Sequence, residues 1–268
     1  MRVRTFTLLV ALAVLIAASF TLLYWQKRDV RDHVTAPPVA EGVELLLPLP
    51  EPRSGLSVEE ALISRKSIRE YSGRPINLSD LALLLWAAQG ITEYDGWYRR
   101  TAPSAGATYP LEVYVVVGEG GVLSGNGYLA AGVYKYDTLR HSLLLVKTGD
   151  VRSELWDSAL RQDWVRDAPV SIVICAVYER TTRRYGERGV RYVHMEAGHA
   201  GQNIYLMAAA LKLGTVAVGA FDDEAVARVV GVQRGEEPLY IFPVGVPVEP
   251  YKGSFDELFK VYTVTRGG

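Results

Sequence analysis

The chain has 268 residues and a formal net charge of −1, with 49% hydrophobic and 22% charged residues. This composition is typical of a packed globular protein and argues against intrinsic disorder. Near-neutral charge argues against a dedicated nucleic-acid-binding protein, which usually carries a basic surplus. The single cysteine, Cys175, excludes an internal disulfide and zinc sites with several cysteine ligands. Its apolar neighbours predict an inert, buried strand residue.

Residues 1–26 are predicted to form an N-terminal membrane anchor. The run from Thr5 to Trp25 carries no charge, and about 21 helical residues at ~1.5 Å each would cross a bilayer core. A cleaved signal peptide is the alternative, but the apolar run continues beyond the small residues at 17–19, which favours the anchor. We therefore expect a single-pass membrane protein, or a secreted one if the segment is cleaved. Residues 27–55, rich in proline, are interpreted as a tether.

From residue 56 onward, predicted helices and strands follow one another without regular alternation, which indicates an α+β fold. Ser57 and Glu60 form a capping box, so a helix is expected to begin there and run towards Ser67. Helices are further predicted at 77–90, 151–164, 190–213 and 222–230, and strands at 111–117, 132–136, 142–146, 170–178, 215–218, 239–244 and 261–264. The strands at 132–136 and 142–146 are expected to form a hairpin. The wholly apolar strand at 170–178 is expected in the centre of a sheet.

A basic segment after the first helix is the first candidate for chemistry. Arg65, Lys66, Ser67 and Arg69 place three cations and a hydroxyl within five residues, a set that suits a phosphate group. If the helix continued, Arg65 and Arg69 would share one face. The alternative is a solvated basic helix end, which the helix dipole favours.

Two further stretches offer backbone to a ligand. The loop Pro103, Ser104, Ala105 and Gly106 has side chains small enough for a flat ligand to lie against its backbone, although it also fits an ordinary Pro/Gly loop. The junction at 214–223 joins a strand to a helix, where backbone amides can donate to a ligand edge.

The long helix carries the fourth candidate, Glu196 with Gly198, His199 and Gly201. Glycine in a helix interior costs ~1 kcal/mol against alanine, so the two glycines predict close approach by another backbone or a planar ligand. Glu196 and His199 suggest an acid–base pair or a metal site, but H-E-x-x-H is absent and no third ligand is evident. We interpret His199 as a packing residue and expect no metal.

Taken together and in this order, the stretches resemble the nitroreductase superfamily of FMN enzymes, and within it the SagB-type dehydrogenase branch. The resemblance covers about residues 56–250. The sequences that carry it are SRKSIREY at 64–71, LWAAQG at 85–90, PSAGA at 103–107 with Tyr109 and Pro110, and EAGHAGQN at 196–203. It implies a mixed β-sheet flanked by helices, and a homodimer that holds FMN at the subunit interface and exchanges C-terminal segments.

The resemblance also implies a role for each candidate stretch. The residues expected to hold the FMN phosphate and ribityl chain are Arg65, Lys66, Ser67 and Arg69. Those expected to border the isoalloxazine, reaching from the partner subunit, are Pro103, Ser104, Ala105 and Gly106. Those expected along the other ring edge, with a backbone N–H near flavin N5, are Ala217, Gly219 and Ala220. Lys252 is a candidate for a basic residue that reaches the phosphate from the C-terminal region.

The function that follows is an FMN-dependent oxidoreductase, which transfers two electrons between NAD(P)H or an organic substrate and an acceptor. Its substrate is expected to be a small molecule or a peptide. No catalytic residue is assigned; the candidate substrate-side groups are Tyr185, Arg191, Tyr192 and His199. One alternative is a membrane-tethered flavin-binding scaffold or redox sensor without turnover. Another is a membrane-tethered hydrolase using His199, although no G-x-S-x-G elbow supports it.

Overall fold

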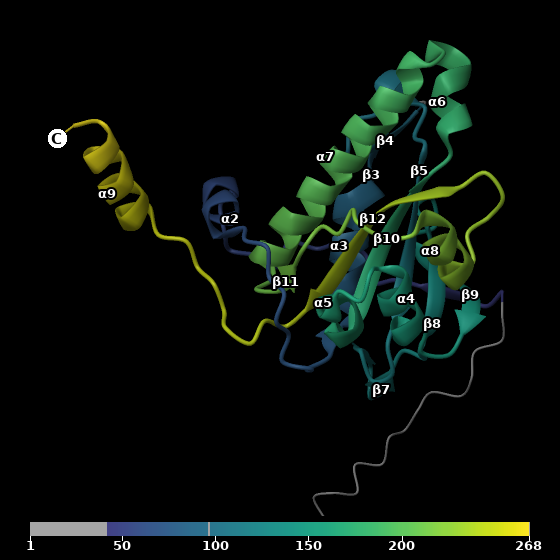
Figure 1. The fold of residues 1–268 in the computed structure, drawn as a ribbon, viewed down its shortest axis with the longest axis horizontal. Coiled ribbons are helices and arrows are strands. Elements are labelled where there is room, and N and C mark those ends of the chain that lie inside the picture. The colour runs from purple at the N-terminus through teal and green to yellow at the C-terminus, as the bar shows by residue number, and fades with distance from the viewer. Residues whose placement is uncertain (1–41, 96, 268) are drawn as a thin grey trace, which may run out of the picture. The chain divides into compact units, whose positions relative to one another are not determined.

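The computed structural model describes residues 42–95 and 97–267. Its main element is a seven-stranded sheet with helices on both faces (Figure 1). In sheet order the strands are β1 (Glu44–Leu46), β9 (Ser142–Thr148), β8 (Gly132–Asp137), β5 (Leu111–Val117), β10 (Val170–Ala176), β12 (Glu237–Gly245) and β11 (Gly214–Thr215). The helices are α2 (Val58–Ser64), α3 (Leu78–Gln89), α4 (Arg152–Ser158), α5 (Asp163–Asp167), α6 (Tyr178–Tyr185), α7 (Arg188–Ala210), α8 (Asp223–Val230) and α9 (Phe255–Thr265).

The predicted α+β fold is confirmed, but the main sheet is not mixed. Every neighbouring pair of its strands is antiparallel. Within the described chain, parallel pairing occurs only between the short strands β2 (Ile76–Asn77) and β6 (Val122–Ser124) and at the isolated bridge from Ser67 to Thr215. The remaining strands are β7 (Gly127–Tyr128), which pairs with β6, and the hairpin of β3 (Ile91–Tyr94) and β4 (Tyr98–Arg100).

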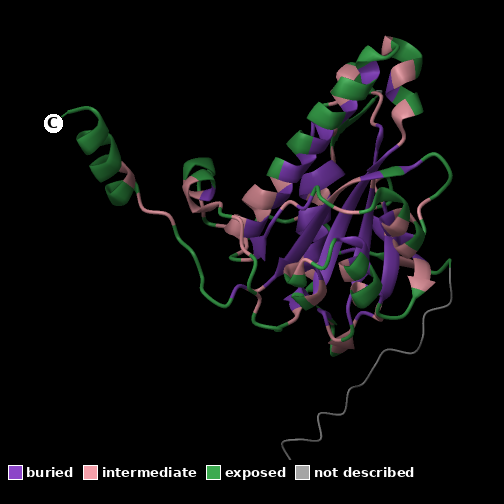
Figure 2. Ribbon diagram, viewed as in Figure 1, coloured by how far each residue is buried: buried purple, intermediate pink, exposed green. Residues whose placement is uncertain are grey.

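The sheet separates two hydrophobic layers (Figure 2). The strand β10 lies between β5 and β12 and is buried along its whole length, which confirms its predicted central place. Because side chains alternate along a strand, Ile172 and Ile174 pack in the layer that contains α3 and α7. Val173 and Cys175 face the opposite layer, which contains α4 and α8. Burial raises the pKa of the Cys175 thiol, in agreement with an inert residue.

Two predicted helices differ from the structure near the candidate site. The capping box of α2 is present, but the helix ends at Ser64 and Arg65 is extended. The basic segment therefore does not share a helix face, because Ile68 N–H donates to Thr215 O and the segment runs beside β11 instead. The predicted helix at 151–164 is broken into α4 and α5, since Leu160 and Arg161 adopt left-handed backbone angles.

The C-terminal tail is a helix, not the predicted strand. Ser254 Oγ accepts a hydrogen bond from Glu257 N–H and caps α9, and acidic residues occupy its first turn, where they favour the helix dipole. These terms outweigh the small helix penalty of β-branched residues such as Val261 and Val264. None of the residues of α9 is buried.

The predicted membrane anchor lies outside the described residues. Within 42–95 and 97–267, no helix has both the length and the apolar character needed to span a bilayer. Part of the proposed tether is structured, because β1 joins the main sheet as its edge strand and pairs with β9 through the apolar run at Leu45 and Leu46. The helix α6, which was not predicted, precedes α7 and is separated from it by Gly186, whose φ is 59°.

Candidate functional site

The basic segment presents three cations without carboxylate partners. Arg65, Lys66 and Arg69 form no ion pair with any residue of the described chain. Each lies over an aromatic ring instead: Arg65 over Tyr205 at 5.1 Å from the ring centre, Lys66 over Tyr251 at 4.9 Å and Arg69 over Trp164 at 5.2 Å. Cation–π contacts orient these groups without neutralising them. Their charge is therefore available to an anion.

A cavity of about 410 Å³ adjoins this segment. Three lysines line it, Lys66, Lys212 and Lys252, and its wall contains no carboxylate. Such a wall suits an anionic group of a ligand rather than a cation. The structure thus places Lys252, the predicted C-terminal candidate, beside Lys66. Lys212 is exposed and was not among the predicted site residues.

Tyr205 is a site residue that sequence reasoning missed. Its hydroxyl lies 3.0 Å from Ser67 Oγ and accepts a hydrogen bond from Ala217 N–H at 2.8 Å. The side chain therefore joins the basic segment to the turn that follows β11. On an apolar helix a tyrosine looks like any packing residue, so no sequence signal distinguished it.

The turn with Ala217, Gly219 and Ala220 directly follows β11, the strand beside which the basic segment runs. The amide of Ala217 is occupied by Tyr205, whereas the amides of Gly219 and Ala220 donate to no residue of the described chain and both residues are exposed. Gln162 Nε2 holds the turn by donating to Ala220 O at 2.9 Å. Two fixed, free donors thus remain for a ligand edge.

The loop Pro103–Gly106 lies elsewhere in the subunit. Arg184 Nη1 of α6 donates to Gly106 O at 3.0 Å, and Ser104 lies close to the buried carboxyl of Glu196 on α7. Along α7, Glu196 and Tyr205 are nine residues apart, which corresponds to ~13 Å. One chain therefore brings together the basic segment and the turn, but not the loop.

A profile of the Nitroreductase family matches residues 62–246, well over half of the chain. The chain belongs to the nitroreductase family. The match contains the basic segment, the loop, α7 and the turn, so every candidate stretch lies within the family region.

Three nitroreductase-family relatives illustrate the similarity. A Methanocaldococcus jannaschii protein, provisionally named a nitroreductase, is 47% identical over 194 residues, 72% of this chain and 93% of that protein. The microcin B17-processing protein McbC of Escherichia coli, a SagB-type relative, is 31% identical over 150 residues, 54% of each chain. A crystal structure from Ralstonia eutropha, also provisionally named a nitroreductase, superposes with a TM-score of 0.66 at 29% identity and covers 79% of this chain and 98% of that one.

Two expectations for the long helix of this nitroreductase-family chain are corrected by the structure. His199 is exposed and Glu196 is buried, so they form no pair, and His199 is not a packing residue. A Cβ on Gly201 would lie 2.7 Å from the Phe242 ring. The neighbour that requires a glycine at this position is therefore a side chain, and not the backbone or planar ligand that was predicted. Gly198 has open space around it.

Of the four residues predicted to face the substrate, the structure brings only Tyr185 and Tyr192 into contact with each other. Tyr185 packs edge-on against Tyr192 with ring centres 5.2 Å apart. A Cβ on Gly106 would fall 2.5 Å from the Tyr185 hydroxyl, so this tyrosine lies directly on the Pro103–Gly106 loop. Arg191 and His199 are exposed on α7.

Proposed function

We propose that this nitroreductase-family protein is an FMN-dependent oxidoreductase. The observation that carries the proposal is the unpaired basic segment, which lies beside a cavity lined by three lysines and next to two free backbone amides. Nitroreductase-family proteins are generally flavin-dependent. A phosphate group needs cations without competing carboxylates, and a flavin edge needs fixed N–H donors. The residues present fit both needs.

FMN would be held by two parts of the site. Arg65, Lys66, Ser67 and Arg69, with Lys212 and Lys252 at the cavity, would hold the phosphate and ribityl chain. The amides of Gly219 and Ala220 would donate to the ring edge. When bound, the flavin supplies two-electron chemistry. The chain's own contribution is to orient the ring and to stabilise negative charge on it, so no side-chain acid or base is assigned.

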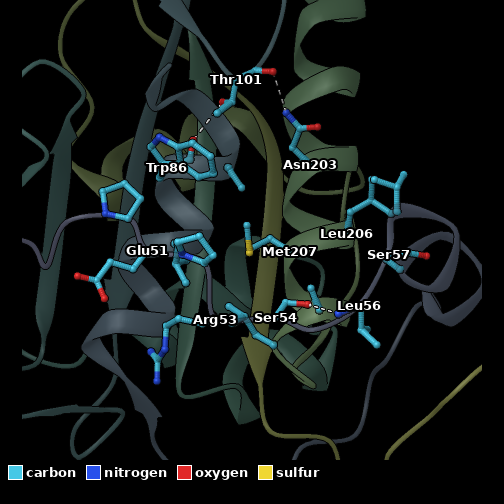
Figure 3. Close-up of a pocket in the computed structure, with 18 of the residues that line it drawn as sticks. Glu51, Arg53, Ser54, Leu56, Ser57, Trp86, Thr101, Asn203, Leu206 and Met207 are labelled. Carbon is cyan, nitrogen blue, oxygen red and sulfur yellow. Dashed lines mark hydrogen bonds between the residues drawn. The ribbon is translucent and has the colours of Figure 1, made fainter. Parts of the chain in front are cut away.

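We further propose that two copies assemble to complete the site. A cavity of about 630 Å³ runs between α2, α3 and α7, with apolar walls that include Trp86, Leu206 and Met207 (Figure 3). The helix α9 exposes Phe255 and Phe259 and buries none of its residues, so both surfaces lack a partner within the described chain. The second copy would cover them, and its Pro103–Gly106 loop would reach the FMN.

The oligomeric state tests this assembly directly. We expect light scattering to give a dimer for the full chain, and a chain shortened after Gly253 to lose dimer or to form it more weakly. Replacing Thr263 and Thr265 on α9 by serine is the matched control and should leave the mass unchanged. A monomeric full chain that binds FMN at full strength would contradict the shared site.

The proposal also covers the class of substrate and the attachment of the protein to a membrane. McbC processes microcin B17, which supports dehydrogenation of a peptide or a related small molecule, with NAD(P)H as the donor in the reductive direction. The apolar run at 5–25 supports attachment to a membrane.

The decisive experiment is to purify the full chain, load it with FMN and follow flavin absorbance under anaerobic conditions. We expect one FMN for each subunit, bleaching by NADH, NADPH or an organic donor, and selective recovery of colour with an acceptor. Failure to bind FMN would overturn the proposal. Binding without selective reoxidation would favour the scaffold or sensor instead.

A further inference from the structure

The corner between α4 and α5 has a strained backbone that its neighbours hold in place. Leu160 and Arg161 have φ values of 54° and 58°, in the left-handed region that is unfavourable for residues with a Cβ. On either side of them, Ala159 and Val165 are fully buried in the layer that contains α4 and α8. Conformations of this kind persist only where surrounding contacts hold them, and they gather at functional sites. This corner is therefore a candidate for a role beyond packing.

One side of the corner contacts the turn that carries the free amides. Gln162 Nε2 donates to Ala220 O and to Ala159 O, both at 2.9 Å, so this side chain bridges the turn and the corner. Two residues further along the turn, the backbone N–H of Asp222 donates to Ser158 O at 2.9 Å. The corner therefore holds the turn at two points, although 58 residues of sequence separate Gln162 from Ala220.

The first part of the turn is held by the sheet instead. Val218 exchanges two backbone hydrogen bonds with Ile241 of β12, at 2.8 and 2.9 Å. Between Val218 and Asp222, the bond from Gln162 to Ala220 is the one hydrogen bond that the described chain makes to the turn. The direction of the free amides in this stretch therefore depends on the Gln162 side chain.

The other side of the corner supports the basic segment. The Arg69 guanidinium lies over the Trp164 ring, 5.2 Å from the ring centre. Trp164 is half-buried and packs against the same hydrophobic layer as Ala159 and Val165. A fixed aromatic ring limits the guanidinium to few positions and does not neutralise its charge. Trp164 thus orients Arg69 before an anion binds, which lowers the entropy cost of binding.

We propose that the corner at residues 158–164 sets the position of the free amides of the turn relative to the cations of the basic segment. Gln162 is the positioning residue for the turn, and Trp164 is the positioning residue for Arg69. A ligand that spans both parts needs them at a fixed separation, and one rigid corner supplies it. The identity of that ligand as FMN rests on the proposed function; the contacts of the corner do not.

Titration of FMN and of riboflavin onto the full chain separates the two positioning roles. In Gln162→Ala, the loosened turn should weaken the binding of both ligands about tenfold, because both carry the flavin ring. In Trp164→Leu, FMN should bind about fivefold more weakly and riboflavin as in the parent chain, because only FMN carries the phosphate. Trp164→Phe keeps an aromatic face and should restore FMN binding. A merely structural role of the corner would weaken both ligands alike in both variants.

Matched controls come from residues of the same types that do not contact the site. The Trp156 ring lies under Arg161 and Arg166, 5.6 and 4.9 Å from their guanidinium carbons, and not under the basic segment. Gln233 is exposed in the loop after α8. Trp156→Leu and Gln233→Ala should therefore bind both flavins as the parent chain does.

Hydrogen exchange without added flavin tests the same contact independently of FMN. The amides of Val218 and Asp222, which are hydrogen-bonded at the two ends of the stretch, should exchange about tenfold faster in Gln162→Ala than in the parent chain. Gln162→Glu keeps the length of the side chain but has no N–H to donate, and it takes the place of Gln162→Ala if that variant does not fold.

The outcomes for the corner and for the proposed function are distinct. Unchanged exchange at the turn, or an equal loss of FMN and riboflavin binding in Trp164→Leu, would overturn the positioning role. A parent chain that binds no FMN, while its Gln162 variant shows the faster exchange, would overturn the proposed function and leave the support of the turn by the corner established.

Discussion

The Tyr205 hydroxyl accepts a hydrogen bond from the Ala217 amide at 2.8 Å and lies 3.0 Å from Ser67 Oγ. One side chain of α7 thus connects the basic segment with the turn whose free amides complete the candidate site. The position of these two parts relative to each other depends on a contact between residues far apart in the sequence.

Tyr205→Phe is expected to destabilise the protein. The Ala217 amide would lose its acceptor in a half-buried place, which costs about 1–3 kcal/mol and lowers Tm by roughly 2–4 °C for each kcal/mol. Differential scanning calorimetry of the parent chain and of Tyr205→Phe measures this decrease in Tm. Tyr262→Phe, on the exposed face of α9, is the control and should leave Tm nearly unchanged. An unaltered Tm for Tyr205→Phe would show that the bond contributes little.

Replacing Arg65 and Arg69 by alanine is expected to weaken FMN binding selectively. Each lost charge-assisted contact is worth about 1.5–3 kcal/mol, so the Kd for FMN should rise at least tenfold. Riboflavin, which lacks the phosphate, should bind the variant and the parent chain alike. Titrations followed by flavin fluorescence measure both ligands.

The control for this double variant is Arg183→Ala, at an exposed arginine paired with Glu179 on α6. Its affinity for both flavins should be that of the parent chain. An equal loss of FMN and riboflavin binding in the double variant would place the phosphate elsewhere.

Glu196 is expected to make stability depend on pH. Because its pKa is raised from 4.5 to about 7, the folded chain holds this proton more tightly than the unfolded chain. The contribution of this proton to the free energy of unfolding is fully present below about pH 4.5 and is lost as pH rises through about 7. The change in the free energy of unfolding is roughly 3 kcal/mol at most. Urea unfolding measures the free energy of unfolding of the parent chain and of Glu196→Gln. The difference between these two free energies should change with pH between about 4.5 and 7. A constant difference would contradict the raised pKa.

Cys175 is expected to be unreactive in the folded protein. The thiol is fully buried in β10, and burial raises its pKa, so little thiolate forms. A thiol reagent such as DTNB should label it only after denaturation. Rapid labelling of the native chain would contradict both its burial and its interpretation as an inert strand residue.

Local chemistry was enough to predict much of the fold. The capping box at Ser57, the glycine after Gln89 and the apolar run of β10 act through near neighbours or through burial of a whole strand, and the structure confirms the elements they predict. The end of α2, the break at Leu160 and the helical tail were predicted wrongly. There, pairing with β11, a left-handed turn and a capped helix start outweighed residue propensity.

The amino-acid order was sufficient to identify the family stretches, including Arg65 to Arg69 and the loop at 103–106, because motif and spacing are properties of the chain itself. It could not show that the three cations lack carboxylate partners, that Tyr205 joins two parts of the site, or that Glu196 is buried away from His199. These facts depend on contacts across many residues and on loss of solvent, and both arise when the helices pack on the sheet.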